Sequence, residues 1–288
     1  MGKEGFEESK EEKKEWPEFQ EVPTEKWRSR AWAEAPSERP QPTPEQKEEM
    51  NREIIGTGKL MNESGCWWQL DGGFNVSLLK GEYVGVHVDV DISVERRDLP
   101  KIEKYLLEKG FGLFKVNKKK GPKKKLWRVG AEDFKYEEGW NLRFIPIDED
   151  GRHRVDPNIR SIEVAVIERD ERGKYSGWRG TPLPEKWLNW KKIDFHGVPI
   201  PLSHPAKFFF YKMWFTRGSK EDDKGGYDDR DIGEYLKLNV LTEEDLRDIQ
   251  RVANQVLRHY EENYRGNFRR ISEKRLKQLR DWLKSRTI

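Results

Sequence analysis

The sequence has little cysteine and no long apolar run. Cys66 is the single cysteine among 288 residues, so the chain cannot form an internal disulfide, which fits a reducing compartment. No stretch approaches the roughly 18 consecutive apolar residues that a membrane-spanning helix requires, and the first residues contain no apolar signal core. We therefore expect a soluble cytoplasmic protein in which Cys66 is an inert core residue.

Charge is abundant but unevenly distributed. The net charge is +3, yet residues 1–42 hold eight Lys or Arg against eleven Glu, so this segment carries −3 and the remainder +6. The segment is rich in Glu, Lys and Pro and shows no apolar periodicity, which predicts disorder in isolation. Its aromatic residues leave a second interpretation open, an arm that docks on the body or on a partner protein. These residues are Phe6, Trp16, Phe19, Trp27 and Trp32.

The most informative motif joins a Gly-Gly pair to two aspartates. Residues 67–74 read as a buried strand and a glycine turn that opens a helix, and Asp89 and Asp91 follow in a run, 84–94, that we expect to be a second strand. Residues two apart in a strand point to the same face, so the two carboxylates should lie side by side. Adjacent carboxylates repel each other unless a cation lies between them, and hard oxygen ligands suit Mg²⁺ or Mn²⁺.

Gly72 and Gly73 complete a phosphate-binding motif. Glycine lets the backbone approach a ligand closely, and the amides at a helix start favour an anion. The alternative is an ordinary tight turn followed by a strand with two solvated acids. An apolar face on the same strand argues against that alternative, because it leaves the polar face free for chemistry. The apolar face comprises Val86, Val88, Val90 and Ile92, and the polar face comprises His87, Asp89, Asp91 and Ser93.

The stretches 70–79 and 87–92 resemble the signature of polymerase-beta-type nucleotidyltransferases. The pattern is similar to that of the small aminoglycoside and lincosamide nucleotidyltransferases. The resemblance covers about residues 50–240, with the detailed motif confined to 66–94. It implies a mixed-sheet α/β core in which Gly72 and Gly73 hold the triphosphate of an NTP and the two aspartates bind divalent metal ions.

The resemblance also implies a third carboxylate from a later strand. Glu163 is our candidate, because it is the one acid inside the β-rich run 161–167, whose Ile162, Val164 and Val166 should face the core. The family more often has Asp at this position. Asp156 and Glu168 are alternatives at the edges of the run. We expect the Glu163 carboxylate within about 6 Å of one aspartate, close enough to share a metal.

Farther along, the family has a strand pair and then a helix that carries a lysine. Residues 193–201 match the strand pair, and residues 205–214 match the helix. The resemblance places Lys212 near the triphosphate as a point charge. A solvated lysine is the alternative. Asp231 is expected only to cap a helix or form a salt bridge.

We divide the chain into a flexible acidic arm (1–42), a nucleotidyltransferase-like domain (43–240) and a helical C-terminal region (241–288). Thr43 as N-cap, Pro44 and Gln46 predict the first helix, which should end near Ile55 because Gly56 and Gly58 follow. In the C-terminal region, Thr242 to Asp245 should cap one helix and Ser272 should start another.

Six lysines lie between two predicted strands, 111–116 and 126–129: Lys118, Lys119, Lys120, Lys123, Lys124 and Lys125. A solvated hairpin tip that discourages edge pairing is one interpretation. The other is a basic surface that binds RNA.

The sequence therefore predicts metal-dependent transfer of a nucleoside monophosphate from an NTP to an acceptor hydroxyl, with a lean toward RNA as acceptor. Asp89, Asp91 and Glu163 would be the catalytic and metal-binding residues. One alternative is a small-molecule acceptor of the aminoglycoside or lincosamide kind. The other is a non-catalytic protein that uses this fold to join a nucleic-acid or protein assembly.

Overall fold

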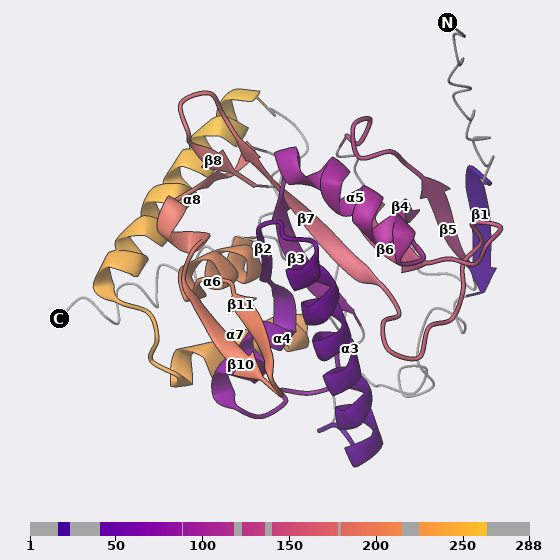
Figure 1. The fold of residues 1–288 in the computed structure, drawn as a ribbon. Helices are drawn as coiled ribbons and strands as arrows, with labels where there is room; N and C mark the ends of the chain where they lie inside the picture. The colour runs from indigo at the N-terminus through magenta and orange to yellow at the C-terminus, as the bar shows by residue number, and fades with distance from the viewer. Residues whose placement is uncertain are drawn as a thin grey trace, which may run out of the picture.

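The computed structural model describes residues 17–23, 41–87, 89–117, 123–135, 140–177, 180–214 and 225–263. Lys118 to Lys120, most of the arm and the expected helix at Ser272 lie outside these residues. The described residues form one mixed α/β structure around an eleven-stranded sheet (Figure 1). The predicted fold class is confirmed.

The sheet mixes parallel and antiparallel pairs. Strand β3 runs parallel to β7, and β2 runs parallel to β11, whereas the other neighbours are antiparallel. Short strands β8 (Tyr175–Ser176) and β9 (Pro182–Leu183) extend from the end of β7. In order across the sheet the strands are β1 (Phe19–Pro23), β5 (Lys123–Arg128), β4 (Phe111–Asn117), β6 (Trp140–Pro146), β7 (Ile162–Arg169), β3 (Val90–Glu95), β2 (Trp68–Leu70), β11 (Val198–Leu202) and β10 (Lys191–Phe195).

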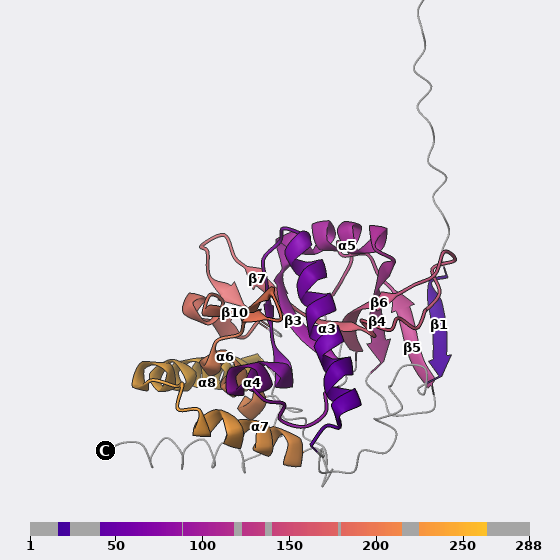
Figure 2. The same cartoon turned by 60° about the horizontal axis from the view of Figure 1, so that its bottom comes forward.

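Helices α3 (Pro44–Glu63) and α5 (Leu99–Glu108) cover one face of the sheet (Figures 1 and 2). Ile54 and Ile102 from these helices pack with Ile92 of β3 and Val164 of β7 in the main core, and all four side chains are buried. Alternate residues of β3 and β7 therefore point away from this core, to the opposite face.

The other helices of the described ranges are α4 (Gly72–Lys80), α6 (Pro205–Trp214), α7 (Gly225–Lys237) and α8 (Glu243–Asn263), with 3₁₀ turns at Arg96–Asp98 and Glu185–Trp187. Ile167, at the end of β7, packs with Phe209 of α6 and Ile249 of α8 in a second core. Helices α6 and α8 thus cover the face opposite α3 and α5. They cover it only at one end, since Ala165 in the middle of β7 is exposed.

The first helix is longer than predicted. The capping box at Thr43 forms as expected, but α3 continues through Gly56 and Gly58 to Glu63. These glycines are close-packing positions. A Cβ built at Gly58 would lie 2.4 Å from Cδ1 of Ile200, so only glycine lets the helix approach β11 so closely.

The strand with the aspartates is shorter than predicted. It begins at Val90 rather than Val84. The His87 side chain is buried against Phe74, with ring centroids 4.7 Å apart, so it does not belong to a solvent-facing row with the acids. The prediction was wrong because the apolar alternation of Val84 and Val86 reflects burial of a connecting segment, which need not be extended.

Part of the arm adds a strand to the sheet. Residues 19–23 form β1, which pairs with β5, and Phe19 packs against Trp127 with centroids 4.5 Å apart. For these residues the second interpretation holds, because this part of the arm docks on the body of the protein. Strand β5 begins at Lys123 instead of Leu126, and Glu21 contacts the ammonium groups of Lys123 and Lys125 at 3.3 and 3.9 Å.

The predicted helix cap at Thr242 to Asp245 forms. Thr242 and Asp245 exchange capping hydrogen bonds at the start of α8. No helix in the described ranges combines the length and the apolar character needed to cross a membrane.

Candidate active site

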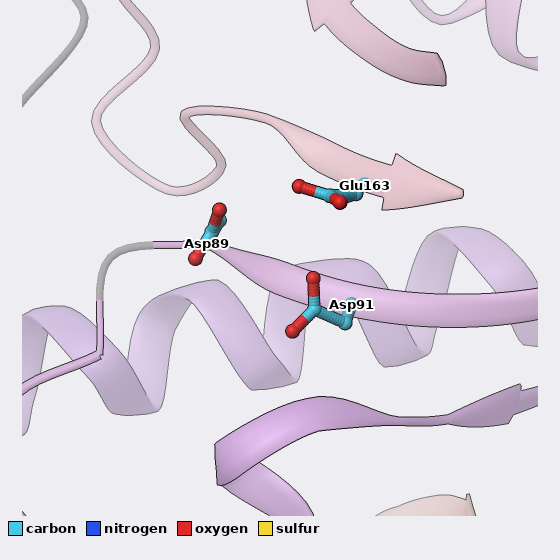
Figure 3. Close-up of side chains that lie close together, drawn as sticks. All are labelled: Asp89, Asp91 and Glu163. Carbon is cyan, nitrogen blue, oxygen red and sulfur yellow. The ribbon is translucent and has the colours of Figure 1, made fainter. Parts of the chain in front are cut away.

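Three carboxylates meet where β3 and β7 lie side by side. Asp91 is directly opposite Glu163 in this parallel pair, and Asp89 comes just before β3. One oxygen from each of the three residues lies within 4.8 Å of the others, and Figure 3 shows the three side chains close together, with Glu163 on the strand next to that of Asp91. The predicted proximity of Glu163 to the aspartates is confirmed. Their catalytic role stays a prediction.

Arg143 completes this cluster, and our sequence reasoning missed it. It lies on β6 opposite Glu163, and its Nη2 donates to Oδ2 of Asp89 at 2.7 Å and to the Glu163 carboxylate. Its Nη1 donates to Oγ of Ser161 at 2.9 Å. A signal was present, because an arginine in the otherwise apolar run 142–147 needs a partner on the face that it occupies.

The cluster carries more negative than positive charge. Burial raises the pKa of Asp91 well above its usual value, and the neighbouring Asp89 and Glu163 raise it further. Burial alone would lower the pKa of Arg143, but Glu163 and Asp89 outweigh this effect and raise it. The charges of Asp89 and Glu163 contribute to both shifts, as expected for a cluster in which carboxylates outnumber the guanidinium.

The Gly-Gly turn lies directly against the acids. Gly72 has φ +68°, and a Cβ built there would lie 2.0 Å from Oδ2 of Asp91. Gly73 has a different neighbour, since its Cβ would lie 2.1 Å from Cε1 of His87. A side chain at Gly73 would therefore meet a buried ring of the core, and of the two glycines it is Gly72 that has the positive φ.

A buried lysine, also missed from the sequence, fixes this turn. Lys207 of α6 is 1% exposed, and its Nζ lies 2.9 and 3.0 Å from the Asp71 carboxylate oxygens and 2.8 Å from Oγ of Ser93. Burial lowers the pKa of Lys207, and Asp71 opposes this shift. Because Asp71 immediately precedes Gly72, this contact joins α6, β3 and the glycine turn.

Lys212 has a carboxylate partner. Its Nζ lies 2.9 Å from Oδ2 of Asp231, which is fully buried, so the salt bridge expected for Asp231 is present. The positive charge of Lys212 also lowers the pKa of Asp91, which places it within electrostatic range of the acids. Contact between Lys212 and a triphosphate stays a prediction.

The acid cluster fits a divalent metal ion. Ligands of an octahedral Mg²⁺ lie about 3 Å apart when adjacent and about 4.2 Å apart when opposite, so oxygens within 4.8 Å of one another reach a common ion after small side-chain movements. Hard carboxylate oxygens also suit Mn²⁺. Within the described part of the chain, the Asp91 carboxylate accepts no hydrogen bond and is available to coordinate an ion.

Comparison with known proteins supports a nucleotidyltransferase resemblance. The model of the aminoglycoside-2''-adenylyltransferase family matches residues 54–123, which include the glycine turn and both aspartates. No curated protein sequence matches the chain. The chain therefore resembles the nucleotidyltransferases, as its motif predicted, and the family that it matches is one of enzymes.

Among solved structures, ANT(2'')-Ia in complex with adenylyl-2''-tobramycin shares 8% identity, with a TM-score of 0.47 over 74% of this chain and 99% of that one. Lincomycin-bound LnuA, a lincosamide antibiotic adenylyltransferase, shares 14%, with a TM-score of 0.38 over 69% and 99%. An antigenic nucleotidyltransferase-like protein from Paracoccidioides brasiliensis shares 13%, with a TM-score of 0.43 over 75% and 90%.

Proposed function

We propose that the protein is a metal-dependent nucleotidyltransferase that transfers a nucleoside monophosphate, AMP in the first instance, from an NTP to a hydroxyl group of a small molecule. The observation that carries the proposal is the meeting of Asp89, Asp91 and Glu163 beside Gly72 at the start of α4. Carboxylates that can hold a metal next to a phosphate-binding turn are what phosphoryl transfer requires.

Different residues would bind the metal, bind the triphosphate and position the glycine turn. Asp89, Asp91 and Glu163 are the candidate ligands for Mg²⁺ or Mn²⁺, which would supply charge stabilisation at the transferred phosphoryl group. The amides at the start of α4 would bind the triphosphate, with Lys212 adding a positive charge from α6. Lys207 would act indirectly, because it contacts Asp71 and thereby positions the glycine turn.

We favour a small-molecule acceptor over the RNA toward which the sequence leaned. Lys123 and Lys125 already contact Glu21, so part of the basic surface is neutralised by the arm. Strand β5 lies three strands from β7, which separates these lysines from the acids by roughly 14 Å at about 4.8 Å per strand. The name of the matching family also points to an aminoglycoside-like acceptor.

The experiment is a transfer assay with each labelled NTP, Mg²⁺ or Mn²⁺, and three sets of acceptors: aminoglycosides, lincosamides and total cellular RNA. We expect label from ATP on a small molecule, and none with the Asp91→Asn control. Labelled RNA without labelled small molecules would restore the RNA hypothesis. Absence of transfer to every acceptor, with intact metal and NTP binding, would favour the non-catalytic assembly protein.

A further inference from the structure

Arg143 is held in place from several sides. In the sheet its neighbours are Glu163 on β7 and Phe114 on β4, and the Phe114 side chain is completely buried. Its guanidinium reaches away from Phe114 to Glu163 and Asp89 and is further bonded to Ser161. The residue is 8% exposed, so its positive charge is a fixed part of the sheet face.

Displacing this guanidinium would be unfavourable. If a metal ion took its place at Asp89 and Glu163, the positive charge would remain buried without its carboxylate partners, and a buried charge requires a partner. Phe114 fills the neighbouring position on one side, and Ser161 holds Nη1 on another. The ion pairs of Arg143 should therefore persist when the active site is loaded.

Of the three carboxylates, Asp91 is the one to which Arg143 does not donate a hydrogen bond in the described structure. Arg143 bonds to Asp89 and Glu163, whereas the Asp91 carboxylate accepts no hydrogen bond within the described residues. Three ionised carboxylates against one guanidinium leave two negative charges, which one divalent cation balances. Two-metal sites place their ions about 3.5–4 Å apart, and here the guanidinium already occupies the side of the cluster between Asp89 and Glu163.

We infer that Arg143 takes the place of one of two metal ions, so that this site binds a single divalent cation, held by Asp91 and Asp89. The catalytic meaning of this inference rests on the proposed function. Arg143 would supply permanently the positive charge that a second ion would otherwise bring. It would also hold Glu163 in position.

The test is to count bound ions with Mn²⁺ alone, by following the free Mn²⁺ signal in electron paramagnetic resonance. We expect one Mn²⁺ per native chain with a dissociation constant below about 1 mM, and two per chain in Arg143→Met. Arg143→Lys, which keeps the charge, should bind one. Asp91→Asn should lose the ion.

The outcomes are distinct. Two ions in the native chain, or none, would overturn the inference, and so would an unchanged count in a folded Arg143→Met variant. If Arg143→Met does not fold, the number of Mn²⁺ ions bound by the native chain and by Arg143→Lys still tests the inference. Two ions in either protein would contradict it. Transfer is not measured, so a chain that binds one Mn²⁺ but labels no acceptor would refute the proposed function alone.

Discussion

Two buried cations lie on the same face of the sheet, and they are neutralised to different degrees. Lys207 is 1% exposed and contacts one carboxylate, that of Asp71, together with the Ser93 hydroxyl. Arg143 is 8% exposed and contacts two carboxylates, with the third one close by. One cluster is electrically balanced, and the other retains excess negative charge.

The difference separates a structural ion pair from a binding site. A balanced buried pair has no electrostatic need for another charge, and its value lies in joining elements of the fold. An unbalanced cluster is costly until a further cation arrives. The proposed roles are therefore cation binding for the Arg143 cluster and positioning of the glycine turn for the Lys207 cluster.

The largest expected effect is on transfer activity when the unbalanced cluster loses a ligand. Asp91→Asn should lower kcat/KM for nucleotidyl transfer at least about a thousandfold, equivalent to about 4 kcal/mol of transition-state stabilisation. The fold should remain intact, because the substitution removes charge repulsion without changing volume. Steady-state kinetics and urea unfolding of the same preparation check both parts.

The pH dependence gives this variant a second readout. Because the pKa of Asp91 is raised in the folded state, its contribution to stability is full in acid and is lost as the pH rises above the unfolded value toward the folded one. Asn at this position has no such loss. The metal-free stability advantage of Asp91→Asn should therefore widen from acid to neutral pH, and a constant difference would contradict our description of the cluster.

Substitutions in the Lys207 cluster should mainly lower the stability of the fold. Lys207→Met leaves the Asp71 carboxylate near Ser93 without its cation, and we expect a loss of about 3 kcal/mol in the free energy of unfolding. The double variant with Asp71→Asn should recover part of this loss, because no unpaired charge remains. Urea unfolding of the two single variants and the double variant measures the coupling. Additive losses would show that the pair is not a unit.

Much of this arrangement could be predicted from the sequence, because local rules govern it. The capping residue Thr43, the Gly-Gly turn and the alternation that places Glu163 opposite the core each depend on a few neighbouring residues. The metal hypothesis for Asp89 and Asp91 followed from residue types and their spacing, whereas the choice of Glu163 as the third acid rested on the resemblance to the nucleotidyltransferases. Only the local features needed no knowledge of which strands pair.

The two cations could not be predicted in the same way, because their partners are distant in sequence. Arg143 meets Asp89 across 54 positions, and Lys207 meets Asp71 across 136. Strand order decides both contacts, and no local pattern specifies that order. The prediction that Gly56 and Gly58 end the first helix failed for the same reason. Gly58 is explained by its close contact with Ile200, which lies on a strand remote in sequence.

The two glycines of the turn provide a smaller and more specific comparison. Gly72→Ala forces a side chain into positive φ and toward Asp91, and Gly73→Ala pushes against the His87 ring, so each should cost about 1–3 kcal/mol in stability. They should differ in metal binding. Calorimetric Mn²⁺ titration should show weakened affinity for Gly72→Ala and nearly native affinity for folded Gly73→Ala. Equal losses of Mn²⁺ affinity in the two folded variants would indicate that both glycines act through the fold alone.

The smallest effect is expected where ion pairs are exposed. Glu21 contacts Lys123 and Lys125, whose side chains are 60% and 50% exposed, and surface pairs of this kind contribute about 0–1 kcal/mol. Replacing both lysines with Ser should therefore change stability by less than about 1 kcal/mol and leave transfer to a small molecule unchanged. Thermal unfolding and the transfer assay at low and physiological salt test this expectation. A large, salt-dependent loss of transfer would instead show that the lysines bind a polyanionic acceptor, because phosphate contacts weaken steeply with salt.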